Sequence, residues 1–86
     1  MGSPSGSMRS KTIHSADYRV LLKMLKAARG EMPQTELAKS LKMPQSMLSK
    51  YERGELRLDI IQLRAWCKAL GVDFVTLVAE FAKRTG

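Results

Sequence analysis

The chain has 86 residues, with 15 Lys and Arg against 8 Asp and Glu and a formal net charge of +7. This length suits one small domain, the single cysteine excludes an internal disulfide framework, and the short apolar runs exclude a membrane-spanning helix. The basic excess favours an anionic partner, with nucleic acid ahead of a membrane surface.

The first 14 residues show no apolar periodicity. Residues 1–7 are small or turn-forming, which is typical of a cloning remnant, and residues 8–14 are polar and basic. We therefore expect a remnant and a flexible basic arm over residues 1–14, and one folded domain over residues 15–84.

Apolar residues at spacings of three and four predict a first helix that begins near Ala16. Ser15 or Asp17 can cap its start, and Gly30 can end it in the left-handed conformation. The apolar stripe of this helix consists of Tyr18, Leu21, Leu22, Leu25 and Ala28.

Two prolines mark the next two helices, because the first helical turn tolerates a missing N–H. Pro33 lies at the start of the second helix and Pro44 at the start of the third, which Gly54 ends. The residues that we expect to face the core from these helices are Leu37, Ala38, Leu41, Leu48 and Tyr51.

A capping box of Asp59 and Gln62 predicts the start of a fourth helix, which Gly71 ends, and Asp73 caps a fifth. Trp66 is interpreted either as part of the core or as an interface residue. The expected core stripe of the fourth helix consists of Ile60, Leu63, Cys67 and Leu70. With no strand-like alternation, the pattern predicts an all-α domain of five short helices.

The stretch from Gln34 to Gly54 has the pattern of a helix-turn-helix, with a small residue, Ala38, where the two helices must approach closely. The outer face of the second of these helices carries short polar side chains that can reach base edges. They are Gln45, Ser46 and Ser49, with Lys50 nearby. A glutamine can pair with adenine through two hydrogen bonds in the major groove.

The segments Gln34-Thr-Glu-Leu-Ala38 and Ser49-Lys-Tyr-Glu-Arg-Gly54 resemble the phage-repressor, or Xre/Cro-like, helix-turn-helix family, as do Leu58-Asp59 and Ala69-Leu-Gly-Val72. The resemblance extends over roughly residues 18 to 82. It implies a lambda-repressor-like DNA-binding domain and a sequence-specific transcriptional regulator. We expect a repressor of prophage or mobile-element origin, bacterial, cytoplasmic and associated with the nucleoid.

The same resemblance implies roles for individual residues. Glu52 is expected to pair with a basic residue of the first helix, for which Lys26 is the best match. Lys42 stands where the family usually has a glycine of positive φ, and Pro44 stands at the usual Ser or Thr cap. The residues assigned to DNA contact are Gln34, Pro44, Gln45, Ser46, Ser49, Lys50, Arg53 and Arg57.

One short recognition helix reads few base pairs, so we expect a homodimer on a palindromic operator of double-stranded DNA. The expected dimer interface consists of Phe74, Val75, Val78 and Phe81. No enzyme, metal site or cofactor is expected, because the chain has no Gly-rich phosphate loop and its one His and one Cys lie far apart. The alternative functions are an antitoxin of a toxin–antitoxin pair and a control protein of a restriction system, acting partly through protein contacts.

Overall fold

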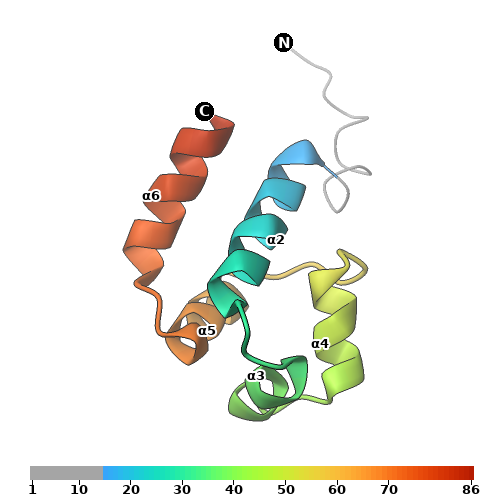
Figure 1. The fold of residues 1–86 in the computed structure, drawn as a ribbon. Helices are drawn as coiled ribbons and strands as arrows, with labels where there is room; N and C mark the ends of the chain where they lie inside the picture. Colours follow the sequence, from blue (N-terminus) through green and yellow to red (C-terminus); the bar gives the residue numbers. More distant parts are fainter. Residues whose placement is uncertain (1–14) are drawn as a thin grey trace.

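The computed structural model describes residues 15–86, which form five α-helices and no strand (Figure 1). In chain order these are α2 Ala16–Arg29, α3 Gln34–Ser40, α4 Gln45–Glu52, α5 Ile60–Leu70 and α6 Phe74–Thr85. The all-α, five-helix expectation is confirmed. The remnant and basic arm expected over residues 1–14 lie outside the described residues.

The helices form two groups that meet at α5. In Figure 1, α2 and α6 lie side by side, and the two helices are in contact. The short helices α3 and α4 pack against each other at the opposite end, and α5 contacts both α3 and α6. This arrangement leaves one side of α4 without a neighbouring helix (Figure 1).

Side-chain caps fix the starts of the three longer helices. Ser15, and not Asp17, caps α2, because its Oγ accepts a hydrogen bond from the backbone N–H of Tyr18 at 3.1 Å. The capping box of Asp59 and Gln62 is present at α5, and Asp73 caps α6.

The two turns that lead into α3 and α4 also follow local chemistry. Pro33 and Pro44 are the N-cap residues of α3 and α4, and neither helix has a side-chain cap. Lys42, between the two helices, has a φ of 58°, which confirms the expected positive φ at a residue with a Cβ. Gly30 ends α2 with a positive φ of 54° but a ψ of −123°, so the expected left-handed helical conformation is wrong there.

The core is centred on four enclosed side chains from three helices: Leu37, Leu48, Trp66 and Cys67. Trp66 is therefore a core residue, with its ring edge against Tyr51. Ile60 was expected on the core stripe but is 66% exposed. Ile60 is the first residue of α5, and a helical side chain points toward the N-terminus of its helix. The Ile60 side chain therefore extends beyond the helix, and Leu58 in the preceding segment is buried in its place. Similarly, Ala28 is exposed, whereas Met24 is buried.

The connection between α4 and α5 is held on α2 by one tyrosine. The Tyr18 hydroxyl accepts a hydrogen bond from the N–H of Leu58 at 2.9 Å and donates to the carbonyl of Leu56 at 3.3 Å. The guanidinium carbon of Arg57 lies 5.2 Å from the centre of the Tyr18 ring, within the range of a cation–π contact. The path from the recognition region to α5 is thus tied to the first turn of α2.

Candidate nucleic-acid interface

The helix α4 buries one side and exposes the other. Leu48, Tyr51 and Glu52 are buried, and Ser49 is half-buried. The exposed residues of this helix and its ends are Pro44, Gln45, Ser46, Met47, Lys50 and Arg53. Six of the eight sequence-predicted contact residues therefore lie on the exposed side of α4 or at its ends, whereas Gln34 opens α3 and Arg57 lies in the segment after α4, over the Tyr18 ring.

A chain of hydrogen bonds joins α3 to both ends of α4. Gln34 Nε2 donates to Glu52 Oε1 at 2.7 Å, and Gln34 Oε1 accepts from Gln45 Nε2 at 2.6 Å. A carboxylate only accepts hydrogen bonds, so Glu52 sets the orientation of the Gln34 amide. That orientation in turn directs the amino group of Gln45 toward α3 and leaves Gln45 Oε1 for another partner.

The ion pair expected between Lys26 and Glu52 is wrong, because the partner of Glu52 is Arg29. Arg29 Nε donates to Glu52 Oε2 at 2.6 Å, and its Nη2 donates to Glu52 Oε1 at 3.0 Å. Its Nη1 also donates to the carbonyl of Met32 at 2.7 Å. The planar guanidinium binds both carboxylate oxygens through Nε and Nη2 and the loop carbonyl through Nη1, a geometry that the single nitrogen of an ammonium group does not match.

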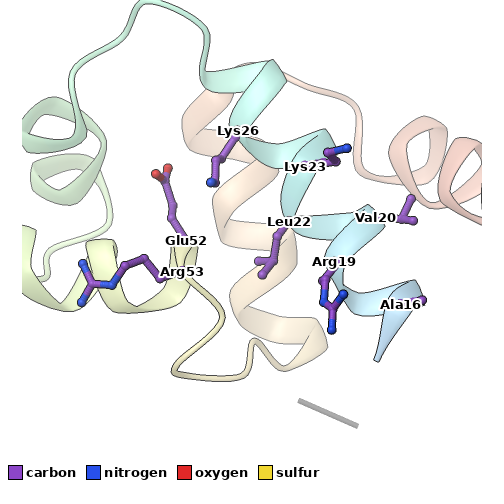
Figure 2. Close-up of a pocket in the computed structure, with 8 residues that line it drawn as sticks. All are labelled: Ala16, Arg19, Val20, Leu22, Lys23, Lys26, Glu52 and Arg53. Atoms are coloured by element: carbon purple, nitrogen blue, oxygen red, sulfur yellow. The ribbon is translucent and has the colours of Figure 1, made fainter. Parts of the chain in front are cut away.

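Lys26 instead lines a groove of about 650 Å³ between α2 and the end of α4. Figure 2 shows Lys26, Lys23 and Arg19 along one side of α2, with Glu52 and Arg53 on α4 and its end. Leu22 contributes an apolar wall. The groove is basic, since its one carboxylate is already bonded to Arg29 and Gln34.

Sequence reasoning did not assign Arg19 or Lys23 to any site. The signal was present, because basic residues at positions 19, 23 and 26 are four and three residues apart and so share one face of a helix. Without the position of α4, however, that face could not be told apart from an ordinary solvated one.

Arg53 is held at the C-terminal end of α4 by two side chains. Its Nε donates to Glu55 Oε2 at 2.8 Å, and its Nη1 donates to Ser49 Oγ. The hydrogen bond from Arg53 holds the pKa of the Glu55 carboxyl below its usual range, and the bond to Glu55 raises the pKa of Arg53. In Figure 2 the end of the Arg53 side chain extends away from α2, although Arg53 also contributes to the lining of the groove.

The second exposed surface lies on α5 and α6 and is apolar. Of the four residues expected at a dimer interface, Val75 is 72% and Val78 38% exposed, whereas Phe74 and Phe81 are half-buried against the core. Ile60 and Ile61 at the start of α5 are also exposed. A shallow groove of about 250 Å³ between the two helices is lined by Ile60, Val78 and Phe81 among others.

Metal binding and membrane insertion are two further functions on which the described residues bear. Within residues 15–86, His, Cys, Asp and Glu side chains do not gather in a group that could hold a metal ion. The Cys67 side chain is enclosed in the core, and burial raises the pKa of its thiol. No helix in this part of the chain has the length and apolar character needed to cross a membrane.

Two short helices joined by a tight turn, with the second braced at both ends and polar on its open side, define a helix-turn-helix DNA-binding domain. The family model described as helix-turn-helix matches residues 19–77. The chain belongs to the Xre-like helix-turn-helix family. It is accordingly a DNA-binding regulator of transcription.

The structure is also similar to a solved one, an XRE-family like protein from Pseudomonas syringae pv. tomato str. DC3000. The two chains are 40% identical, with a TM-score of 0.80 over 91% of this chain and 98% of the other. None of the curated proteins compared with the sequence matches it.

Proposed function

We propose that the chain is a sequence-specific, non-enzymatic repressor of prophage or mobile-element origin that binds a palindromic operator as a homodimer. The observation that carries this proposal is the polar outer side of α4, braced through Gln34 at both ends. A surface meant for a protein partner would be expected to carry apolar anchors there.

The orientation of Gln45 supports adenine as one of the bases read. One N–H of its amide is used by Gln34, and the second N–H and Oε1 remain for DNA. Adenine presents an N6 amino donor and an N7 acceptor in the major groove, which match this pair of groups. Gln34 therefore holds the side chain in the arrangement that a two-bond contact requires.

Phosphate contacts are assigned to residues around α4. Lys50 is exposed on α4, Arg57 follows in the segment that leads to α5 with its guanidinium over the Tyr18 ring, and Arg53 keeps its Nη2 group for a phosphate. Because Pro44 provides no side-chain cap, the first N–H groups of α4 are also open to an anion. These contacts position the helix, whereas Gln45, Ser46 and Ser49 read the sequence.

The apolar surface of α5 and α6 supports the homodimer. Val75 and Val78 are exposed on α6, and Ile61 adds an apolar side chain that is 72% exposed at the start of α5. For two copies related by a two-fold axis to read a palindrome, their α4 helices need to lie in successive major grooves, about one helical turn apart. The same surface also supports the alternative of an antitoxin or restriction control protein, with a different protein in place of the second copy.

Selection from a random DNA pool tests the proposal. The wild-type chain should enrich a palindrome, and sedimentation equilibrium should find two chains per site. Gln45→Ala should weaken binding to the selected site by about 1–3 kcal/mol and relax one base position. Arg57→Ala should weaken binding to selected and to unselected DNA by the same factor. Enrichment of no sequence would exclude the proposed function.

A reporter gene behind the selected site distinguishes repression from activation. Expression should fall when the wild-type chain is present and recover with Gln45→Ala. If one chain saturates the site and a second protein is needed for tight binding, the antitoxin or control-protein alternative is favoured instead.

A further inference from the structure

The side chain of Ser49 stands in the middle of the reading surface, and one of its two acceptor lone pairs is already used by Arg53. Arg53 Nη1 donates to Ser49 Oγ from one helical turn further along. A serine hydroxyl has one hydrogen to donate and two lone pairs to accept with. The arginine can only donate, so the Ser49 hydrogen must point elsewhere.

The other usual partner of a helical hydroxyl is the carbonyl four residues earlier. Thr85 in α6 uses this partner, since its Oγ1 donates to the carbonyl of Phe81 at 2.8 Å. Ser49 makes no such bond, and no hydrogen bond donated by Ser49 is present within residues 15–86. Its hydroxyl hydrogen therefore remains for a partner outside the described chain.

Glu55 keeps Arg53 in this position. It lies just beyond the end of α4, and its Oε2 accepts from Arg53 Nε at 2.8 Å while Nη1 of the same guanidinium reaches Ser49. Two bonds to one planar group fix both its place and its rotation, which a single point contact would not. Arg53 and Glu55 are only two residues apart, so little chain entropy opposes their pairing.

We propose that Glu55, acting through Arg53, holds the Ser49 hydroxyl as a hydrogen-bond donor toward the DNA and so helps to determine which base is accepted at that position. This inference rests on the proposed function, in which α4 reads the major groove. Glu55 is a positioning residue here, and Ser49 is the residue that touches the base.

The chemistry of base edges gives the proposal a direction. In the major groove guanine offers the acceptors N7 and O6, adenine offers N7 and thymine offers O4, but cytosine offers the N4 amino donor. With one lone pair taken by Arg53 and its hydrogen directed toward the groove, the Ser49 hydroxyl favours bases that offer an acceptor over cytosine. A hydroxyl free to rotate accepts from cytosine as readily as it donates to the other bases.

The ion pair of Arg53 and Glu55 is exposed. Exposed ion pairs are weak in general, so we expect a modest effect on base preference. The same geometry occurs far from α4, where Arg84 Nε donates to Glu80 Oε2 at 2.8 Å on α6. Both pairs lower the pKa of their carboxyl, by the same cause. Glu80→Ala is therefore a matched control, because it breaks a similar pair and removes the same charge.

The test is selection from a random DNA pool by the wild type, Glu55→Ala, Glu55→Gln and Glu80→Ala. We expect the wild type to disfavour cytosine at one position of each half-site by about three- to tenfold, the value of one hydrogen bond. Glu55→Ala should abolish that preference and no other. Glu55→Gln, which still accepts a hydrogen bond, should restore part of it, and Glu80→Ala should keep it all.

Three results would overturn the inference. If Glu55→Ala leaves every base preference unchanged while the wild type still selects a sequence, the proposed function stands and the role of Glu55 is wrong. If Glu80→Ala relaxes the same position, the effect comes from net charge. If the wild type selects no sequence, the proposed function fails, and the inference fails with it. Thermal unfolding of each variant shows that the fold is retained.

Discussion

The side chains on the outer side of α4 are polar, and hydrogen bonds fix their positions. Those on the outer side of α6 and at the start of α5 are apolar, and these helices are held in place by packing against the core. Gln45 on α4 is bonded to its neighbour Gln34, while Val75 on α6 and Ile61 on α5 are each 72% exposed. Polar groups need fixed directions to discriminate between bases, and apolar groups need only a complementary surface. The difference is the one that the proposed function requires of a chain that reads DNA with one surface and binds a second copy with another.

The polar side of this comparison depends most on Glu52, whose side chain is 6% exposed. Glu52→Ala strands Arg29 and releases Gln34, so we expect a loss of about 3 kcal/mol in the free energy of unfolding, as for other buried pairs broken from one side. Urea denaturation measures this loss. A double-mutant cycle should find coupling between Glu52 and Arg29 and additivity between Glu52 and Lys26.

If the cycle finds coupling of Glu52 to Lys26 and not to Arg29, the pair seen in the structure is wrong and the pair expected from the sequence is favoured. Glu36→Ala serves as the control, because Glu36 lies exposed in the first turn of α3. It should change stability by no more than about 0.5 kcal/mol.

The apolar side is tested by Val78→Glu, which places a charge on the exposed face of α6. We expect the dissociation constant of the DNA-bound dimer to rise at least about tenfold, which corresponds to 1.4 kcal/mol. Sedimentation equilibrium with a selected site measures it. Lys68→Ala makes the same change in net charge on α5 and should have no effect on dimerisation. A dimer unaffected by Val78→Glu would mean that α6 is not the interface.

The turn that joins α3 to α4 is expected to gain stability from a substitution. Lys42 has a φ of 58°, which costs a residue with a Cβ about 1 kcal/mol relative to glycine. Lys42→Gly should raise the midpoint of thermal unfolding measured without DNA, and Lys42→Val should lower it. Lys39→Gly, within α3, should lower the midpoint, because glycine is unfavourable in a helix interior. Equal stability of the wild type, Lys42→Gly and Lys42→Val would contradict this account.

The basic groove beside α4 gives the smallest predicted effect. If the DNA backbone passes along α2, Lys23→Ala and Lys26→Ala should each reduce the slope of log affinity against log salt by about 1. The same substitution at Lys83, near the end of α6, should leave the slope unchanged. If all three variants keep the slope of the wild type, DNA contact is limited to α3, α4 and the segment that follows them.

Features fixed by neighbouring residues could be predicted from the sequence. The capping box at Asp59 and the cap at Asp73 each depend on a few adjacent positions, and both are present. The positive φ of Lys42 is also present, but it was expected from the glycine usual at that place in the family that the sequence resembles. The polar face of α4 also followed from residue type and helical spacing.

Features that depend on how helices meet could not be predicted in the same way. The choice of Arg29 over Lys26 depends on the direction of the loop after α2, where Arg29 also binds the carbonyl of Met32. Ile60 has the helical spacing of a core residue. It is the first residue of α5, however, and its side chain is exposed and not packed in the core. The link from Glu55 through Arg53 to Ser49 crosses the end of α4, so helical periodicity does not reveal it.

The hydroxyl of Tyr18 bears on the geometry of the assembled regulator. By bonding to Leu56 and Leu58, it sets how the segment after α4 turns into α5, and therefore the angle between the reading face and the apolar face. In a two-fold assembly that angle determines the separation and the tilt of the two copies of α4. A phenylalanine at this position would keep the ring and lose the two bonds. It would be expected to alter the preferred length of the spacer between operator halves while leaving the bases read within each half the same.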